Sequence, residues 1–96
     1  MKTIESINLI YRDPNVRGGR PCLVGTGLRV MDIVMERQHG EADPEKIAAI
    51  YEIPVGGVYA ALAYYYEHKE EIDKDIQKDD DYIRHVKGET LGRQPS

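Results

Sequence analysis

Hydrophobic and polar residues alternate near the start of the chain, where Ile7, Leu9 and Tyr11 occupy every second position. This period of two is typical of a half-buried strand. A turn signal at residues 13–15 and a glycine pair precede a short apolar run at residues 21–24, which predicts a second short strand. Because an isolated sheet of this size is marginally stable, we expect two or three short strands wrapped on a helical core.

After these strands the apolar positions change to the spacing of a helix. A first helix is predicted from Val30 to a stop signal that ends in Gly40. Asp43 followed by Pro44 is an N-cap signal for a second helix, which Pro54 should end. A third helix follows directly, so the three helices have a helix-turn-helix-like layout.

The third helical pattern is the most regular in the chain, with apolar or tyrosine positions in steps of four and three within residues 55–86. Lys69 and Asp79 are polar breaks in what is otherwise a heptad seam. As one helix this stretch would be roughly 48 Å long, whereas a small domain is about 30 Å across. Either the helix breaks near residues 67–70, or its distal half leaves the domain and finds a partner. Because an apolar seam in water is a liability, we expect the distal half to face a partner.

These patterns predict a mainly α fold with a small N-terminal β portion. Residues 1–69 should hold the β-turn segment and a helix-turn-helix-like three-helix core, residues 70–87 a long C-terminal helix extension, and residues 88–96 a flexible tail. With 96 residues one domain is expected, which excludes an enzyme with a cleft between two lobes. We find neither a stretch apolar enough to cross a bilayer nor a signal peptide, so we expect a cytoplasmic protein without membrane contact.

The formal net charge of -4 hides an uneven distribution of charge along the chain. Residues 1–31 carry five basic and two acidic groups, a net of +3, whereas residues 32–66 and 67–87 sum to -4 and -3. Only the first third can therefore offer a positive face to a polyanion. Guanidinium groups on glycine-rich turns can reach phosphates, and the candidates for DNA contact are Arg17, Arg20 and Arg29. The alternative is that these arginines decorate an ordinary surface.

The sequence offers no arrangement of residues that would support catalysis. Its three histidines stand apart from further ligands at metal spacing, and Cys22 lies in an apolar run where a small buried side chain is expected. The glycines match neither a phosphate-binding loop nor a dinucleotide fingerprint. We therefore predict no catalytic residue, no metal, no cofactor and no enzymatic activity. The third helix also lacks base-reading side chains before Lys69, which favours a structural three-helix core over a DNA reader.

Three stretches form a recognisable combination: GGRPCLVGTGLRVMDIV at residues 18–34, the helix start at residues 43–47, and AALAYYYEHKEEID at residues 60–73. Together they resemble the domain-of-unknown-function family numbered 433, over roughly residues 4–75. The family's commonest motif has an arginine directly after Gly-Thr. This chain has Gly27 at that position, and its nearest arginine is Arg29.

The resemblance implies a small, helix-turn-helix-like, cytoplasmic prokaryotic protein that forms a homodimer. Members of the family are often regarded as antitoxins whose partner is a PIN-like nuclease toxin, and such a protein can also bind its own operator DNA. The partner-binding candidates lie on the distal helix and tail, and they are Ile72, Ile76, Ile83, Arg84, Val86, Lys87 and Arg93. The cationic members of this set are candidates to cap the carboxylate metal site of the nuclease, where a cation competes with Mg²⁺.

Two other functions remain open beside the antitoxin. One is a DNA-binding transcriptional regulator without a toxin partner, whose affinity for DNA should fall steeply with salt. The other is a plain dimerisation module, which should bind neither nucleic acid nor a nuclease.

Overall fold

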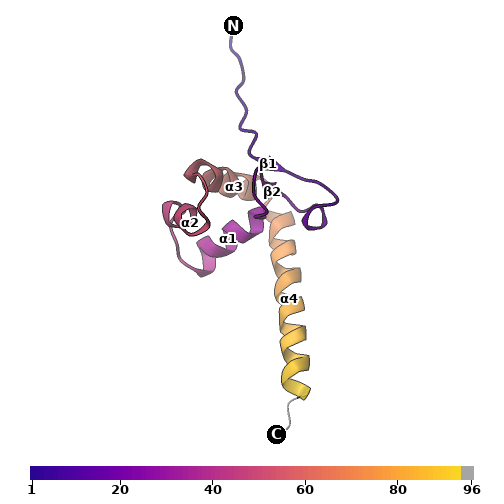
Figure 1. The fold of residues 1–96 in the computed structure, drawn as a ribbon. Coiled ribbons are helices and arrows are strands. Elements are labelled where there is room, and N and C mark those ends of the chain that lie inside the picture. The colour runs from indigo at the N-terminus through magenta and orange to yellow at the C-terminus, as the bar shows by residue number, and fades with distance from the viewer. Residues whose placement is uncertain (94–96) are drawn as a thin grey trace.

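The computed structural model describes the backbone of residues 1–93 and the side chains of residues 1–86. The side chains of Lys87 and Arg93, two of the partner-binding candidates, therefore lie outside the described residues. In chain order the elements are β1 (Ile10–Tyr11), the short 3-10 helix η1 (Arg17–Gly19), β2 (Cys22–Leu23), α1 (Val30–His39), α2 (Pro44–Tyr51), α3 (Val55–Glu67) and α4 (Lys69–Arg93). The mainly α fold with a small N-terminal β portion is thus confirmed (Figure 1).

The β portion is a short antiparallel ladder. Its register pairs Ile10 with Leu23 and Tyr11 with Cys22. The backbone N–H of Val24 extends the ladder by donating to the carbonyl of Leu9 at 2.9 Å. The strand is shorter than the alternation predicted, because Ile7 lies outside the ladder and has 77% of its surface exposed. The chain after β2 turns at residues 24–27, so the pairing partner ends there.

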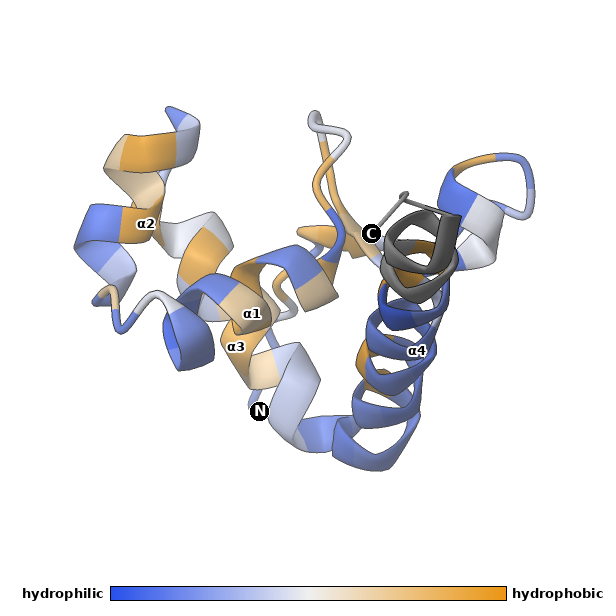
Figure 2. Ribbon diagram, turned by 90° about the horizontal axis from the view of Figure 1, so that it is seen from below, coloured by the Kyte–Doolittle hydropathy of each residue, from blue (hydrophilic) through white to orange (hydrophobic). Residues whose placement is uncertain are grey.

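Helices α1, α2 and α3 pack together as the body, and their apolar faces meet in one core (Figure 2). Burial of an aliphatic side chain of this size contributes about 1.5–3 kcal/mol, so these faces hold the three helices together. The side chains with 1% of their surface exposed or less on these helices are Val30, Ile33, Val34, Ile47, Val58 and Ala61.

The predicted start of α2 is confirmed, because the Asp43 carboxylate accepts a hydrogen bond from the backbone N–H of Lys46 at 2.8 Å. The helix ends at Tyr51, before Pro54, as predicted. Glu52 then adopts a left-handed conformation with φ 56°. The short connection reverses the chain, and α2 and α3 are bent by 119° relative to each other.

A break near residues 67–70 was one of the two alternatives for the third helical pattern, and the structure shows it. His68 leaves helical geometry, with φ -132° and ψ 35°, and separates α3 from α4. Its ring stacks on that of Tyr64, with the ring centroids 4.0 Å apart. The change of direction lets the first turns of α4 pack against the body.

This packing shows that the prediction was wrong for two of the partner-binding candidates. Ile72 and Ile76 are 1% and 9% exposed and belong to the core of their own chain. They follow the same heptad seam as Val58 and Tyr65, so the seam faces the body on both sides of the break. The helical backbone of α4 also continues through residues 88–93, which the sequence assigned to a tail.

The N-terminal segment and α4 leave the body in opposite directions (Figure 1). The molecule accordingly measures 71 × 28 × 22 Å, with a radius of gyration of 16.3 Å. A compact chain of this length would have a radius of gyration of about 12.5 Å. Within the described residues no single helix is long and apolar enough to cross a membrane, although the bent pair of α2 and α3 meets that test when taken together.

Candidate functional site

The three arginines suggested for DNA contact come from turns at the N-terminal side of the body. Arg17 begins η1, Arg20 follows η1, and Arg29 is the residue before α1. Gly18 and Gly19 make the intervening turn possible, since their φ angles of 69° and 79° are costly for other residues. Contacts to the shared carboxylates of Asp32 and Asp79 bring the three guanidinium groups into one cluster.

Two of these guanidinium groups hold a single carboxylate of α4 between them. Arg20 Nη1 donates to Oδ1 of Asp79 at 3.0 Å, and Arg29 Nη1 donates to Oδ2 of the same residue at 3.2 Å. We call Arg20 and Arg29 the arginine fork. Asp75, one turn earlier on α4, lies 3.9 Å from Arg20 Nε. Because charge-assisted hydrogen bonds are roughly twice as strong as neutral ones, the fork fixes α4 against the turns that precede α1.

Asp32 on α1 holds Arg29 from the other side. Its two carboxylate oxygens accept from Arg29 Nη2 at 2.8 Å and Arg29 Nε at 3.2 Å. The backbone N–H of Arg29 also donates to Asp32 Oδ2 at 2.9 Å. This pairing raises the pKa of Arg29 above its ordinary value. Arg29 is therefore oriented by α1 itself, independently of α4.

The cluster is electrically balanced. Three arginines meet three aspartates, so its formal charge is 3 − 3 = 0. Burial alone would raise the pKa of Asp79, but Arg20 and Arg29 outweigh it and hold that pKa below its ordinary value. Exposure of the side chain falls from 47% at Arg17 to 16% at Arg29. A neutral, half-buried cluster offers a polyanion little net attraction.

Sequence analysis identified the arginines as candidate site residues but did not identify the aspartates that pair with them. One signal for Asp79 was available, because it interrupts an apolar seam that must face the body. A carboxylate at such a position needs a cationic partner to offset the loss of hydration. Asp32 and Asp75 carry no comparable signal, since aspartates on the outer faces of helices are ordinary.

Beyond Asp79 the apolar seam of α4 continues but is exposed. Tyr82 and Ile83 have 69% and 44% of their surfaces exposed, and Val86 has 40%. Arg84 is exposed on the same stretch of helix. Figure 2 shows α4 as a mainly hydrophilic helix with isolated hydrophobic residues. We call the exposed apolar side chains of Tyr82, Ile83 and Val86 the distal face.

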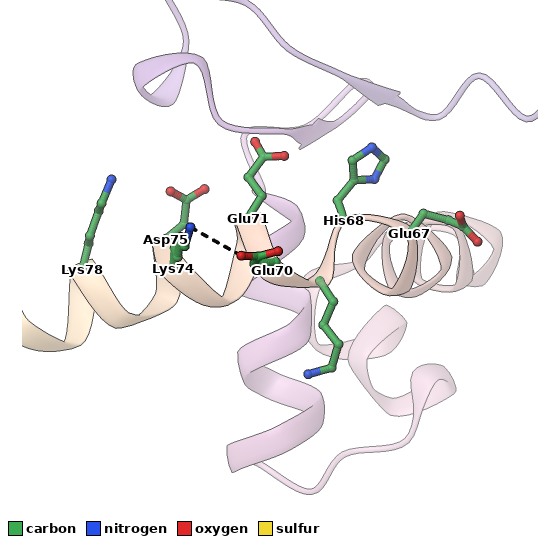
Figure 3. Close-up of a pocket in the computed structure, with 8 residues that line it drawn as sticks. Glu67, His68, Glu70, Glu71, Lys74, Asp75 and Lys78 are labelled. Atoms are coloured by element: carbon green, nitrogen blue, oxygen red, sulfur yellow. Dashed lines mark ion pairs between the residues drawn. The ribbon is translucent and has the colours of Figure 1, made fainter.

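The break between α3 and α4 forms an open groove of about 530 Å³, whose lining is almost wholly charged (Figure 3). Lysines and carboxylates alternate along it, and the side chains drawn there do not converge on a common point. Lys74 and Glu70 pair with each other across one helical turn at 3.6 Å. Such exposed pairs are typical of a solvated helix surface.

The predicted burial of Cys22 is confirmed, because its side chain has no exposed surface. Burial raises the pKa of the thiol, and its Sγ lies 3.4 Å from the carbonyl oxygen of Arg20. A buried, protonated thiol is a poor nucleophile. Across the part of the chain that the structure describes, no group of three His, Cys, Asp or Glu side chains could hold a metal ion.

Comparison with known proteins finds a matching family and a similar crystal structure. The family model described as "Protein of unknown function (DUF433)" matches residues 10–65, which is more than half of the sequence. The chain belongs to the DUF433 family. The crystal structure of a DUF433 member protein from Anabaena variabilis ATCC 29413 is similar to this DUF433 chain, with 32% sequence identity and a TM-score of 0.67. That similarity covers 73% of this chain and 69% of the other. No curated protein matches the sequence.

The family match ends inside α3, so it covers the β portion and the body but not α4. Arg17, Arg20 and Arg29 lie within the matched region, whereas Asp75, Asp79 and the distal face lie beyond it. The arginine cluster therefore joins the DUF433 region to the helix that follows.

Proposed function

We propose that the chain is a non-enzymatic, antitoxin-like protein that neutralises a PIN-like nuclease toxin and acts as a homodimer. In this proposal the distal face of α4 is the surface presented to the nuclease. Membership in DUF433 is consistent with the proposal but does not define an activity, since the family is described only as of unknown function.

The observation that carries the proposal is the exposed distal face. The seam of α4 is buried at Ile72 and Ile76 and exposed at Ile83 and Val86, although its heptad spacing is unchanged. A helix with an apolar stripe is a common docking element, which packs its stripe into a groove of the partner. The elongated shape places this stripe beyond the body, where a partner can reach it (Figure 1).

Arg84 supplies a positive charge to the proposed contact. It is exposed and directly follows Ile83 in the chain, at the flank of the distal face, and a guanidinium group pairs well with carboxylates. The metal site of a PIN-like nuclease is built from carboxylates, so a cation from this helix would compete there with Mg²⁺. Lys87 and Arg93 remain candidates for the same role.

The test is binding of this chain to a purified PIN-like nuclease that is encoded beside it. Ile83→Asp should weaken the affinity at least about tenfold, because a carboxylate would be buried without a partner in the interface. Arg84→Ala should instead reduce inhibition of RNA cleavage more than it reduces binding. Calorimetry measures the first effect and a nuclease assay the second.

Ile4→Asp is the matched control, since it places the same charge at an exposed isoleucine far along the chain from α4. It should leave affinity and inhibition unchanged. Equal losses for Ile83→Asp and Ile4→Asp would contradict the role of the distal face, and absence of any binding would contradict the antitoxin proposal itself. A chain that ends at Lys87 and still neutralises the nuclease would remove Arg93 from the contact.

The second candidate function is a DNA-binding regulator. The 119° bend between α2 and α3 lies within the range of helix-turn-helix units. The first turn of α3 nevertheless offers Val55, Gly56 and Gly57, which cannot read base edges. This candidate predicts operator binding that weakens with salt and on replacement of Arg17, Arg20 or Arg29 by alanine.

A further inference from the structure

The arginine fork has the geometry of a receptor for an oxyanion. Arg20 and Arg29 each donate to a different oxygen of the Asp79 carboxylate, at 3.0 and 3.2 Å. Two guanidinium groups that converge on two oxygens of one anion form an arrangement that also suits phosphate. In this molecule the anion is supplied by its own helix α4.

Both guanidinium groups are positioned by contacts other than Asp79. Asp32 holds Arg29 through two hydrogen bonds of 2.8 and 3.2 Å. Arg20 Nη1 also lies 3.7 Å from the sulfur of Met31, and Arg20 Nε lies 3.9 Å from Asp75. The fork should therefore keep its shape when Asp79 leaves, which lowers the cost of binding another anion.

We propose that the arginine fork is a binding site for a backbone phosphate of DNA, and that Asp79 occupies it as a built-in competitor. The whole cluster is neutral while Asp79 is in place. Without that carboxylate it has a formal charge of 3 − 2 = +1. Binding of DNA and docking of α4 at Asp79 then exclude each other. This inference does not depend on the proposed nuclease.

The surroundings favour a polymer over a single phosphate ion. Arg17 lies beside the fork, where it contacts Asp32 at 4.0 Å, and its side chain is 47% exposed. A third guanidinium group next to the site can meet a neighbouring phosphate of the same strand. An isolated phosphate ion would leave Arg17 without this role.

The experiment compares Asp79→Ala with the wild-type chain. Binding to a short random-sequence DNA duplex is measured by fluorescence anisotropy over a series of salt concentrations. Asp79→Ala should bind about tenfold more tightly than wild type, with a salt dependence steeper by about one to two phosphate contacts. The double variant Asp79→Ala with Arg20→Ala should lose this gain.

Asp81→Ala is the matched control, because it removes the same charge from α4 at a carboxylate that pairs with Gln77 at 2.9 Å. It should change DNA affinity much less than Asp79→Ala does. Equal gains for the two variants would show a general effect of net charge and overturn the site. An unchanged affinity of Asp79→Ala would overturn it as well.

A test with inorganic phosphate distinguishes a site that binds only the phosphate ion from a site that binds DNA. At equal ionic strength, phosphate in place of chloride should raise the melting temperature of Asp79→Ala more than that of wild type, since phosphate also stabilises folded proteins without binding to a site. If Asp79→Ala is unfolded in chloride, phosphate should restore its folded state, and failure to do so would overturn the site. Stabilisation by phosphate without tighter DNA binding would overturn the assignment to DNA.

Discussion

Among single residues, Asp79 combines two effects. Its carboxylate attaches α4 to the turns before α1, and it neutralises the arginine fork. An aspartate at a seam position would be costly if it faced only apolar side chains. The two guanidinium groups offset that cost, so a polar residue here is compatible with a packed helix.

The pH dependence of stability should report this role. The pKa of Asp79 is lowered in the folded state, so its contribution is present above the ordinary aspartate pKa of about 3.9 and is lost as pH falls through the folded value. Asp79→Asn should lower the free energy of unfolding by about 1–2 kcal/mol at pH 7 and flatten its decline in acid. Urea denaturation at pH 7 and below pH 4 measures both. Asp81→Asn should follow the wild-type profile, and parallel profiles for Asp79→Asn and wild type would contradict the prediction.

At the scale of elements, local sequence signals set most helix boundaries. Asp43 and Pro44 start α2, and its end depends on a residue in an unfavourable conformation. Glu52 adopts φ 56°, where residues with a Cβ atom are disfavoured by roughly 1–2 kcal/mol. Glycine is the usual residue at this point in a helix end.

Glu52→Gly should therefore stabilise the protein by up to about 1 kcal/mol, because glycine avoids the steric cost of the left-handed conformation. Glu52→Ala is the control, since alanine removes the carboxylate but keeps the Cβ atom. Thermal unfolding of both variants measures the difference. A gain shared by both variants would point to charge instead of backbone conformation.

Helix α4 is divided between a buried and an exposed part. Ile72→Ala should lower the free energy of unfolding by about 2–5 kcal/mol, because it opens a cavity at a residue that is 1% exposed. Ile83→Ala removes the same atoms at a residue that is 44% exposed, and it should change stability by about 0.5 kcal/mol or less. Chemical denaturation compares them. Similar losses would mean that the distal face packs on its own chain.

At the scale of the whole molecule, the body is small and two segments project from it (Figure 1). The fork contacts α4 at Asp79, about one turn before the distal face. The two sites are therefore close together on one helix, and a partner bound at the distal face would lie near the arginine cluster.

Small-angle scattering at low concentration tests the shape. The chain as a monomer should have a radius of gyration near the 16.3 Å of the structure, well above the value of about 12.5 Å for a compact chain of this length. The mass from the same data shows whether a homodimer forms at higher concentration. A monomer near the compact value would mean that α4 folds back on the body.

Much of the fold follows from local signals in the sequence. The starts of α1 and α2 and the burial of Cys22 were predicted, because capping residues, proline and apolar spacing act within a few positions. The break near residues 67–70 was one of two alternatives that the sequence left open, and the structure decided it. The extent of the first strand was not predicted correctly. Ile7 has the right alternation, but a strand also needs a partner, and the partner turns away at residues 24–27.

The sequence by itself determined that α4 has an apolar seam with polar breaks at Lys69 and Asp79, and that basic residues gather in the first third of the chain. Only the tertiary structure decided that the seam is buried at Ile72 and Ile76 and exposed at Ile83, and that Arg20 and Arg29 meet Asp79. The physical reason is that helical spacing is a local property, set by 3.6 residues per turn. The size of the body against which the helix packs decides where along the helix the seam becomes exposed. It also decides which charged residues, distant in sequence, come together.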